Sequence, residues 1–165
     1  MVAAFERPVA LSAPEWLHAA LVTPAQVLET RVAREVLRAP YALADLVQQT
    51  HHLAALLLGL QQRDRRLLRA GLHDVLVEPR RAGLIPGFAA VRDAALAAGA
   101  LGAGISGAGP TLFGWFDGRA AAERGAAAMR AAFIAQGIDA SALATPVAGP
   151  AAAVIARDEG MEEAP

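Results

Sequence analysis

Cysteine and lysine are both absent from this sequence of 165 residues. Without cysteine the chain has no disulfide bonds and no thiolate metal ligands, which fits a cytoplasmic protein. Without lysine it has no Walker-type phosphate loop, because that motif needs a lysine to reach the phosphates. All 15 basic residues are therefore arginine, whose planar guanidinium binds carboxylates and phosphates through paired hydrogen bonds. Any small anion that this protein handles is expected to meet arginine.

Aromatic residues, net charge and long apolar runs are also scarce. Aromatics make up 5% of the chain, so the core must be built from leucine, valine and alanine. A net charge of −1 creates no field that would attract nucleic acid or an anionic membrane. The longest apolar run, 53–60, is far too short to span a bilayer, and residues 1–7 do not resemble a signal peptide. We expect one cytoplasmic domain that binds neither nucleic acid nor membranes.

Glycine, by contrast, is concentrated in residues 101–111. The spacing Gly102-x-Gly104-x-x-Gly107 satisfies the dinucleotide-binding pattern, which needs a strand before it and a helix after it. Here Pro110 and a β-prone segment at 111–116 follow, so a strand–loop–strand setting replaces the required helix. Two interpretations stay open, namely a plain glycine-rich hairpin and a loop whose backbone N–H groups hold a phosphate.

Hydrophobic periodicity and turn residues predict the order strand, helices, strand, strand, helix, strand. Strands are expected at 17–23, 101–106, 111–116 and within 143–148, with a continuation at 153–155. Helices are expected at 30–37, 41–60, 64–76 with Asp64 as N-cap, 86–98 and 120–136, with a loop at 78–86 and a frayed acidic tail at 158–165. This order is the split βαβ pattern with extra helices in the first crossover. We expect an α+β fold with an antiparallel sheet of about four strands and helices packed on one face.

Histidine and serine offer little chemistry of their own. His51 and His52 are adjacent, so on a helix they diverge by about 100° and do not share a metal ion easily. His73 next to Asp74 suggests acid–base work, but Ser106 does not stand in a G-x-S-x-G elbow, which argues against a hydrolase. We expect no metal site in this chain.

Arginine provides the candidate binding groups. Arg81, in Glu78-Pro-Arg-Arg81, either presents its fork to a carboxylate or is simply a solvated charge. Thr30 and Arg34 are four residues apart and lie on one helix face. Thr30 is a candidate N-cap or ligand donor, and Arg34 is expected to meet an anion or to pair with a neighbouring glutamate.

Three segments together resemble the homoserine kinases of the GHMP kinase superfamily. They are Thr30-x-x-x-Arg34, residues 74–88 with their E-P-x-R and L-I-P-G-F motifs, and G-I-S-G-A-G-P-T at 104–111. The glycine segment alone indicates only the superfamily, whereas the combination is specific to homoserine kinases. The resemblance runs from about Leu17 to Ile155, nearly the whole chain.

The resemblance implies a ferredoxin-like C-terminal domain and an ATP- and Mg²⁺-dependent transfer of a phosphoryl group to the homoserine hydroxyl, in threonine biosynthesis. Thr30, Arg34 and Arg81 match positions that bind the amino acid in this family, with the arginines on its carboxylate. The glycine loop near the phosphates comprises Gly104, Ser106, Gly107 and Gly109. No catalytic residue and no metal ligand of the family falls in this chain.

The family's ATP loop, P-x-x-x-G-L-G-S-S-A, has no match in this sequence. We therefore expect residues 1–157 to form a GHMP kinase C-terminal-type domain, with 1–16 as a remnant of the preceding domain. ATP and Mg²⁺ are then bound mainly by an N-terminal half supplied in cis or in trans, and the chain alone is catalytically incomplete. The alternative is a non-catalytic ferredoxin-like module for amino-acid binding or dimerisation. Because a half molecule exposes apolar surface, we also expect self-association.

Overall fold

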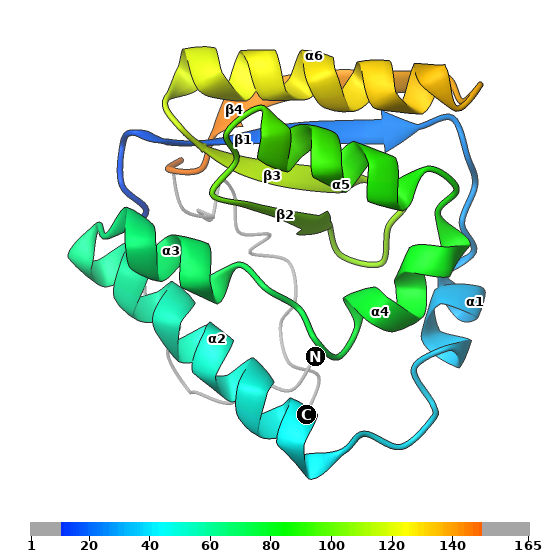
Figure 1. The fold of residues 1–165 in the computed structure, drawn as a ribbon, viewed down its shortest axis with the longest axis horizontal. Helices are drawn as coiled ribbons and strands as arrows, with labels where there is room; N and C mark the ends of the chain where they lie inside the picture. The colour runs from blue at the N-terminus through cyan, green and yellow to red at the C-terminus, as the bar shows by residue number, and fades with distance from the viewer. Residues whose placement is uncertain (1–10, 150–165) are drawn as a thin grey trace, which may run out of the picture.

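The computed structural model describes residues 11–149, and Figure 1 shows their fold. The predicted strand continuation at 153–155, the predicted tail at 158–165 and the first ten residues of the predicted remnant lie outside this range. The elements in chain order are β1 (Leu17–Pro24), α1 (Thr30–Glu35), α2 (Leu43–Gln62), α3 (Arg65–Gly71), α4 (Glu78–Arg81), the 3-10 turn η1 (Ala82–Leu84), α5 (Phe88–Ala97), β2 (Gly102–Ile105), β3 (Leu112–Asp117), α6 (Arg119–Ala135) and β4 (Ala140–Pro146).

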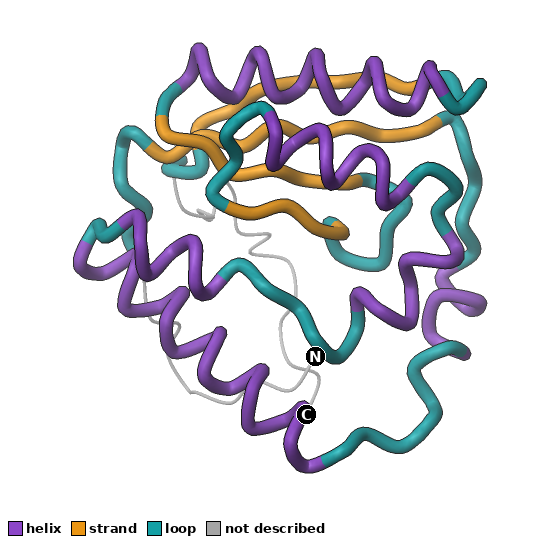
Figure 2. Tube along the Cα trace, in the orientation of Figure 1, coloured by secondary structure: helices purple, strands orange, loops and turns teal. Residues whose placement is uncertain are grey.

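The four strands form one antiparallel sheet in the order β2-β3-β1-β4. The first strand of the chain, β1, lies inside the sheet, with Leu21 opposite Phe113 on one side and Leu143 on the other. Figure 2 shows the strands together as one layer, with α5 and α6 running along it. The predicted α+β fold with a four-stranded antiparallel sheet is confirmed.

Helices α5 and α6 cover one face of the sheet and enclose the main core. On β3 the inward positions Leu112, Gly114 and Phe116 are buried, as the period-2 alternation of a strand requires. The ring of Phe116 fills the space that α6 leaves at Gly125, where a Cβ atom would lie 2.0 Å from the ring. A few large rings set against glycine and alanine thus fill a core that has few aromatic residues.

The α2–α3 hairpin packs against the opposite face, at one end of the sheet, so the expectation that the helices lie on one face holds for α5 and α6 but not for this hairpin. Its Leu60 and Leu68 are buried with Leu17 of β1 and contact Trp115 of β3. The two helices cross closely because Gly71 has no side chain, and a Cβ atom there would lie 2.3 Å from the Leu56 nitrogen. No helix within residues 11–149 combines the length and the apolar character that crossing a membrane requires.

Two predicted boundaries are wrong, each for a physical reason. The segment at 78–86 is not only a loop, because α4 and η1 occupy 78–84. Asp74 accepts hydrogen bonds from the Leu76 and Val77 N–H groups, and Pro79 lies in the first helical turn, where proline is tolerated. Strand β4 begins at Ala140, three residues before the predicted start. Its alanine-rich sequence has a low intrinsic preference for strands, and pairing with β1 stabilises the extended backbone there.

Two helices also end earlier than predicted. Helix α3 ends at Gly71 rather than near residue 76, and α1 ends at Glu35 rather than at residue 37. The predicted N-cap of α3 is confirmed, because the Asp64 carboxylate accepts hydrogen bonds from two backbone N–H groups of the first turn.

Candidate functional site

Helix α4 is a single turn whose last residue joins two other segments. The Arg81 Nε atom donates to the Ala33 carbonyl of α1 at 3.0 Å, and its Nη1 atom donates to the Gly107 carbonyl of the glycine loop at 2.9 Å. Figure 1 shows α1 and α4 side by side, beside the loop that joins β2 to β3. The three segments that the sequence singled out therefore meet at one guanidinium group.

Arg80 contacts the segment between α1 and α2, residues 36–42, which we call the crossover. Its guanidinium donates to the carbonyl oxygens of Ala39 at 2.6 Å and Pro40 at 2.7 Å, and it lies 3.6 Å from the centre of the Tyr41 ring. Stacking of this kind adds a favourable cation–π contact to the charge-assisted hydrogen bonds. Adjacent arginines thus fix α1 and the segment after it to the same helical turn.

Thr30 opens α1, but it is not the N-cap. Glu29 takes that position with φ −64° and ψ 126°, the last extended residue before the helix, so the predicted capping role is wrong. Within residues 11–149 the Thr30 hydroxyl makes no hydrogen bond to another protein group. The side chain is exposed and can still reach a ligand.

Arg34 lies one turn further along the same exposed face. The expected pairing of Arg34 with a neighbouring glutamate is not observed: Glu29 pairs with Arg31 at 3.7 Å, and Glu35 pairs with Arg38 at 3.1 Å. Among the described residues Arg34 takes part in no ion pair. No carboxylate within residues 11–149 therefore neutralises its charge.

The glycine loop is closed at its base and open at its tip. The Ser106 N–H group donates to the Thr111 carbonyl at 2.8 Å, and the Gly109 N–H group donates to the Ser106 carbonyl at 3.0 Å. Gly107 and Gly109 have φ values of 60° and 81°, the left-handed region that favours glycine. In the part of the chain that the structure describes, the N–H groups of Gly107 and Ala108 donate to no protein acceptor. Consecutive free N–H groups of this kind can bind an anion.

Gly104 serves a different neighbour. It lies in β2 rather than in the loop, and a Cβ atom there would lie 2.7 Å from the Oε2 atom of Glu78. The bare backbone of β2 at this point makes room for a carboxylate of α4.

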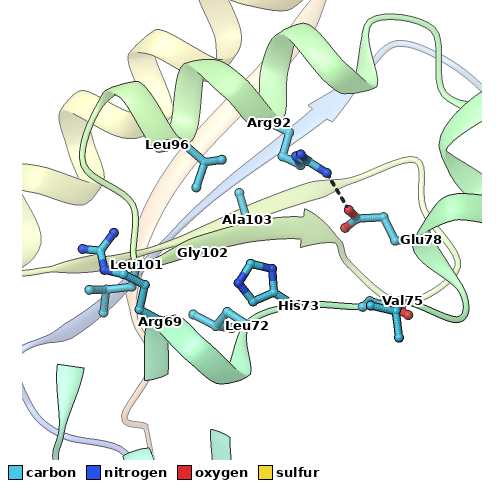
Figure 3. Close-up of a pocket in the computed structure, with 11 residues that line it drawn as sticks. Arg69, Leu72, His73, Val75, Glu78, Arg92, Leu96, Leu101, Gly102 and Ala103 are labelled. Atoms are coloured by element: carbon cyan, nitrogen blue, oxygen red, sulfur yellow. Dashed lines mark hydrogen bonds and ion pairs between the residues drawn. The ribbon is translucent and has the colours of Figure 1, made fainter. Parts of the chain in front are cut away.

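Glu78 projects from α4 toward α5, where its Oε1 atom accepts a hydrogen bond from Arg92 Nη1 at 3.1 Å (Figure 3). Only 13% of the Glu78 side chain is exposed, whereas 42% of the Arg92 side chain is. Burial raises the pKa of Glu78, and the hydrogen bond from Arg92 works against that rise. Glu78 stands in the E-P-x-R motif, but its role was not predicted, because no local sequence signal links Glu78 to Arg92, 14 residues away.

A cavity of about 380 Å³ adjoins this pair, and His73 projects into it between α3 and β2 (Figure 3). Burial lowers the pKa of His73, and the neighbouring His52 and Arg92 lower it further. The rings of His52 and His73 lie 5.2 Å apart, and His52 Nδ1 lies 2.8 Å from the Ala70 carbonyl oxygen. Within residues 11–149 no three His, Cys, Asp or Glu side chains gather closely enough to hold a metal ion. The described residues therefore offer no all-protein cage for a metal ion.

Comparison with known proteins places this geometry in a family. The model of the GHMP kinase C-terminal domain matches residues 53–135. The homoserine kinase of Xylella fastidiosa (strain M12) is 53% identical over 150 residues, which cover 91% of this chain and 47% of that relative. The homoserine kinase of Xanthomonas campestris pv. campestris (strain B100) is 52% identical over 151 residues, which cover 92% and 47% respectively.

A solved structure agrees with the sequence relatives. The crystal structure of homoserine kinase from Cytophaga hutchinsonii superposes with a TM-score of 0.83 at 37% identity, covering 85% of this chain and 44% of that one. The chain thus spans about half the length of the relatives that it matches. The family model and these relatives together show that the chain belongs to the GHMP kinase C-terminal domain family.

Proposed function

We propose that this chain is the homoserine-binding part of a homoserine kinase, a cytoplasmic phosphotransferase of threonine biosynthesis. The observation that carries the proposal is the position of Arg81, which joins the helix of Thr30 and Arg34 to the glycine loop. Similarity to homoserine kinases over 91% of the chain supports it.

Homoserine offers a carboxylate, an ammonium group and a hydroxyl group. Two of the five N–H donors of the Arg81 guanidinium are used by backbone carbonyls, so donors remain for a carboxylate. Arg34, with no ion-pair partner among the described residues, supplies a second positive charge, and the Thr30 hydroxyl supplies a further hydrogen bond. The open N–H groups of the glycine loop then lie beside the substrate, where they suit phosphate oxygens.

ATP supplies the phosphoryl group: its bond to the ADP oxygen breaks as a bond to the homoserine hydroxyl oxygen forms, and the hydroxyl proton is released. We propose that ATP and Mg²⁺ are bound mainly by an N-terminal half, in cis or in trans, and that no catalytic group lies in this chain. The absence of the P-x-x-x-G-L-G-S-S-A motif from the sequence supports the assignment of ATP binding to an N-terminal half.

Homoserine titration followed by calorimetry tests the binding role. The wild-type chain is expected to bind homoserine. Arg81→Ala is expected to weaken binding about tenfold or more, because losing a hydrogen bond to a charged group costs about 1.5 kcal/mol. Arg119→Ala, which alters an exposed arginine on α6, is the matched control and should bind normally. Failure of the wild-type chain to bind homoserine would overturn the proposal.

A phosphoryl-transfer assay tests the division of labour. The chain alone is expected to show no turnover of ATP and homoserine, and turnover should appear when the N-terminal half of the Xylella fastidiosa relative is added. Homoserine-dependent ADP formation by the chain alone would show that the division is wrong.

One observation favours the alternative, a dimerisation module. The apolar stripe of α2, defined here as Leu43, Leu46, Val47, Leu53 and Leu57, is exposed. A homodimer that binds no homoserine and remains inactive with the added N-terminal half would favour that reading.

A further inference from the structure

Helix α4 cannot hold its own orientation. It has four residues, no side-chain N-cap at Val77, and a proline in its first turn. Because isolated helices far longer than this are marginal in water, the direction in which Arg81 points depends on contacts outside α4.

The charged side chains of α4 contact two different parts of the molecule. Arg80 and Arg81 donate to carbonyl oxygens of α1, the crossover and the glycine loop. These are the segments that the two arginines hold in position. Glu78 instead reaches Arg92 on α5 and the backbone of β2, which belong to the sheet and its covering helix. Among the three charged residues of α4, Glu78 is therefore the one that ties the turn to the packed scaffold.

The carboxylate of Glu78 is constrained from two sides. Arg92 donates to Oε1 at 3.1 Å, while Oε2 lies against Gly104 so closely that a Cβ atom there would come within 2.7 Å. A side chain at position 104 would therefore have to displace the Glu78 carboxylate from its place against β2.

This pair is not an obvious source of stability. Taking a carboxylate out of water is costly, and one partner alone seldom offsets that cost. The Nε atom of Arg92 is also buried without a hydrogen-bond partner among the described residues, although the rest of the side chain is partly exposed. A costly pair at this place is better explained by what it positions than by what it stabilises.

We infer that Glu78, held between Arg92 and the bare backbone of Gly104, is a positioning residue for Arg81 in recognition of the homoserine carboxylate. The inference rests on the proposed function for its ligand. Its structural part, the orientation of Arg81, can be measured without any ligand.

The test combines two readouts on the 165-residue chain. The first is the rate at which the Arg81 Nε–H proton, bonded to the Ala33 carbonyl, exchanges with water in NMR spectra. The second is the affinity for homoserine. Glu78→Gln keeps the shape and removes the charge; we expect exchange at Arg81 to accelerate and homoserine affinity to fall by about tenfold, the size of one lost charged hydrogen bond.

Further variants keep the test decisive. Arg92→Ala, at a side chain that is 42% exposed, should have the same effects if Glu78→Gln does not fold, and Arg92→Lys should recover part of the affinity. Glu123→Gln, which breaks an exposed ion pair with Arg119 on α6, is the matched control and should change neither readout.

The two proposals fail in different ways. If the wild-type chain binds no homoserine, the proposed function fails, while Arg81 exchange still tests the positioning role. If Glu78→Gln and Arg92→Ala fold and leave both Arg81 exchange and homoserine affinity unchanged, the positioning role is wrong.

Discussion

At the scale of single residues, burial shifts the pKa values of Glu78, which opens α4, and of His73, which lines the adjoining cavity. Burial favours the neutral form of Glu78, so its native pKa lies above the ordinary value. A raised carboxyl pKa gives a stability contribution that is present below the ordinary pKa and is lost as pH rises through the native pKa.

Glu78→Gln should therefore be at least as stable as wild type at pH 7, because it removes the buried charge and leaves an Arg92 that is partly exposed to water. The advantage over wild type should shrink as the pH falls toward 4. Denaturant unfolding of both proteins across this range gives the measurement. A variant clearly less stable than wild type at pH 7 would mean that the ion pair stabilises the fold.

His73 should behave in the opposite direction. Its native pKa is lowered, chiefly by burial, so its stability contribution is present above the ordinary value of 6.5 and is lost as pH falls through the native pKa. His73→Gln should flatten the decline of the unfolding midpoint between about pH 7 and pH 5. An unchanged slope would show that His73 titrates normally.

At the scale of elements, the contact between β3 and α6 depends on Gly125. A Cβ atom there would lie 2.0 Å from the Phe116 ring, a fully buried side chain with no room to move. Gly125→Ala should destabilise the domain by about 1–3 kcal/mol, the usual cost of overpacking.

Gly83→Ala is the matched control for this prediction. A Cβ atom on Gly83 meets no atom within 4 Å, so that variant should be neutral or more stable by about 0.4–1 kcal/mol. Chemical denaturation of the three proteins measures both effects. Equal losses from the two variants would contradict the packing explanation.

The same elements show what the sequence can and cannot predict. Helices and strands with strong periodicity, such as α2, α5 and β3, are predicted close to their observed bounds. The bounds of strand β4 and helix α4 are not predicted well. Alanine-rich β4 is stabilised by pairing with β1, and four-residue α4 is stabilised by contacts with residues far away in the sequence. The site shows the same division: Arg81 stands in a local motif, while its support by Glu78, Gly104 and Arg92 joins residues up to 26 positions apart.

At the scale of the whole molecule, the apolar stripe of α2 stands out. Its leucines and valine are 44–76% exposed, and Asp45 is the only Asp, Glu or Arg on this helix of 20 residues. A contiguous apolar surface of this kind favours association with another surface.

We expect the chain alone to self-associate through this stripe. Leu46→Glu with Leu53→Glu should shift the sedimentation coefficient toward the monomer, because both carboxylates would have to be buried in the contact. Ile134→Glu, on the exposed surface of α6, is the control. A wild-type chain that sediments as a monomer at the concentrations used for NMR would contradict the expectation.

The bonds from Arg80 and Arg81 that hold α1 and its crossover all end on carbonyl oxygens. A carbonyl oxygen is present whatever the residue, so the exposed side chains of α1 can change during evolution without removing these hydrogen bonds. The arginines themselves have no such freedom, because a lysine ammonium lacks the planar fork that spans two acceptors. Under the proposed function, in which Thr30 and Arg34 contact homoserine, the exposed face of α1 is the place to change substrate preference while the hydrogen bonds that attach α1 stay the same.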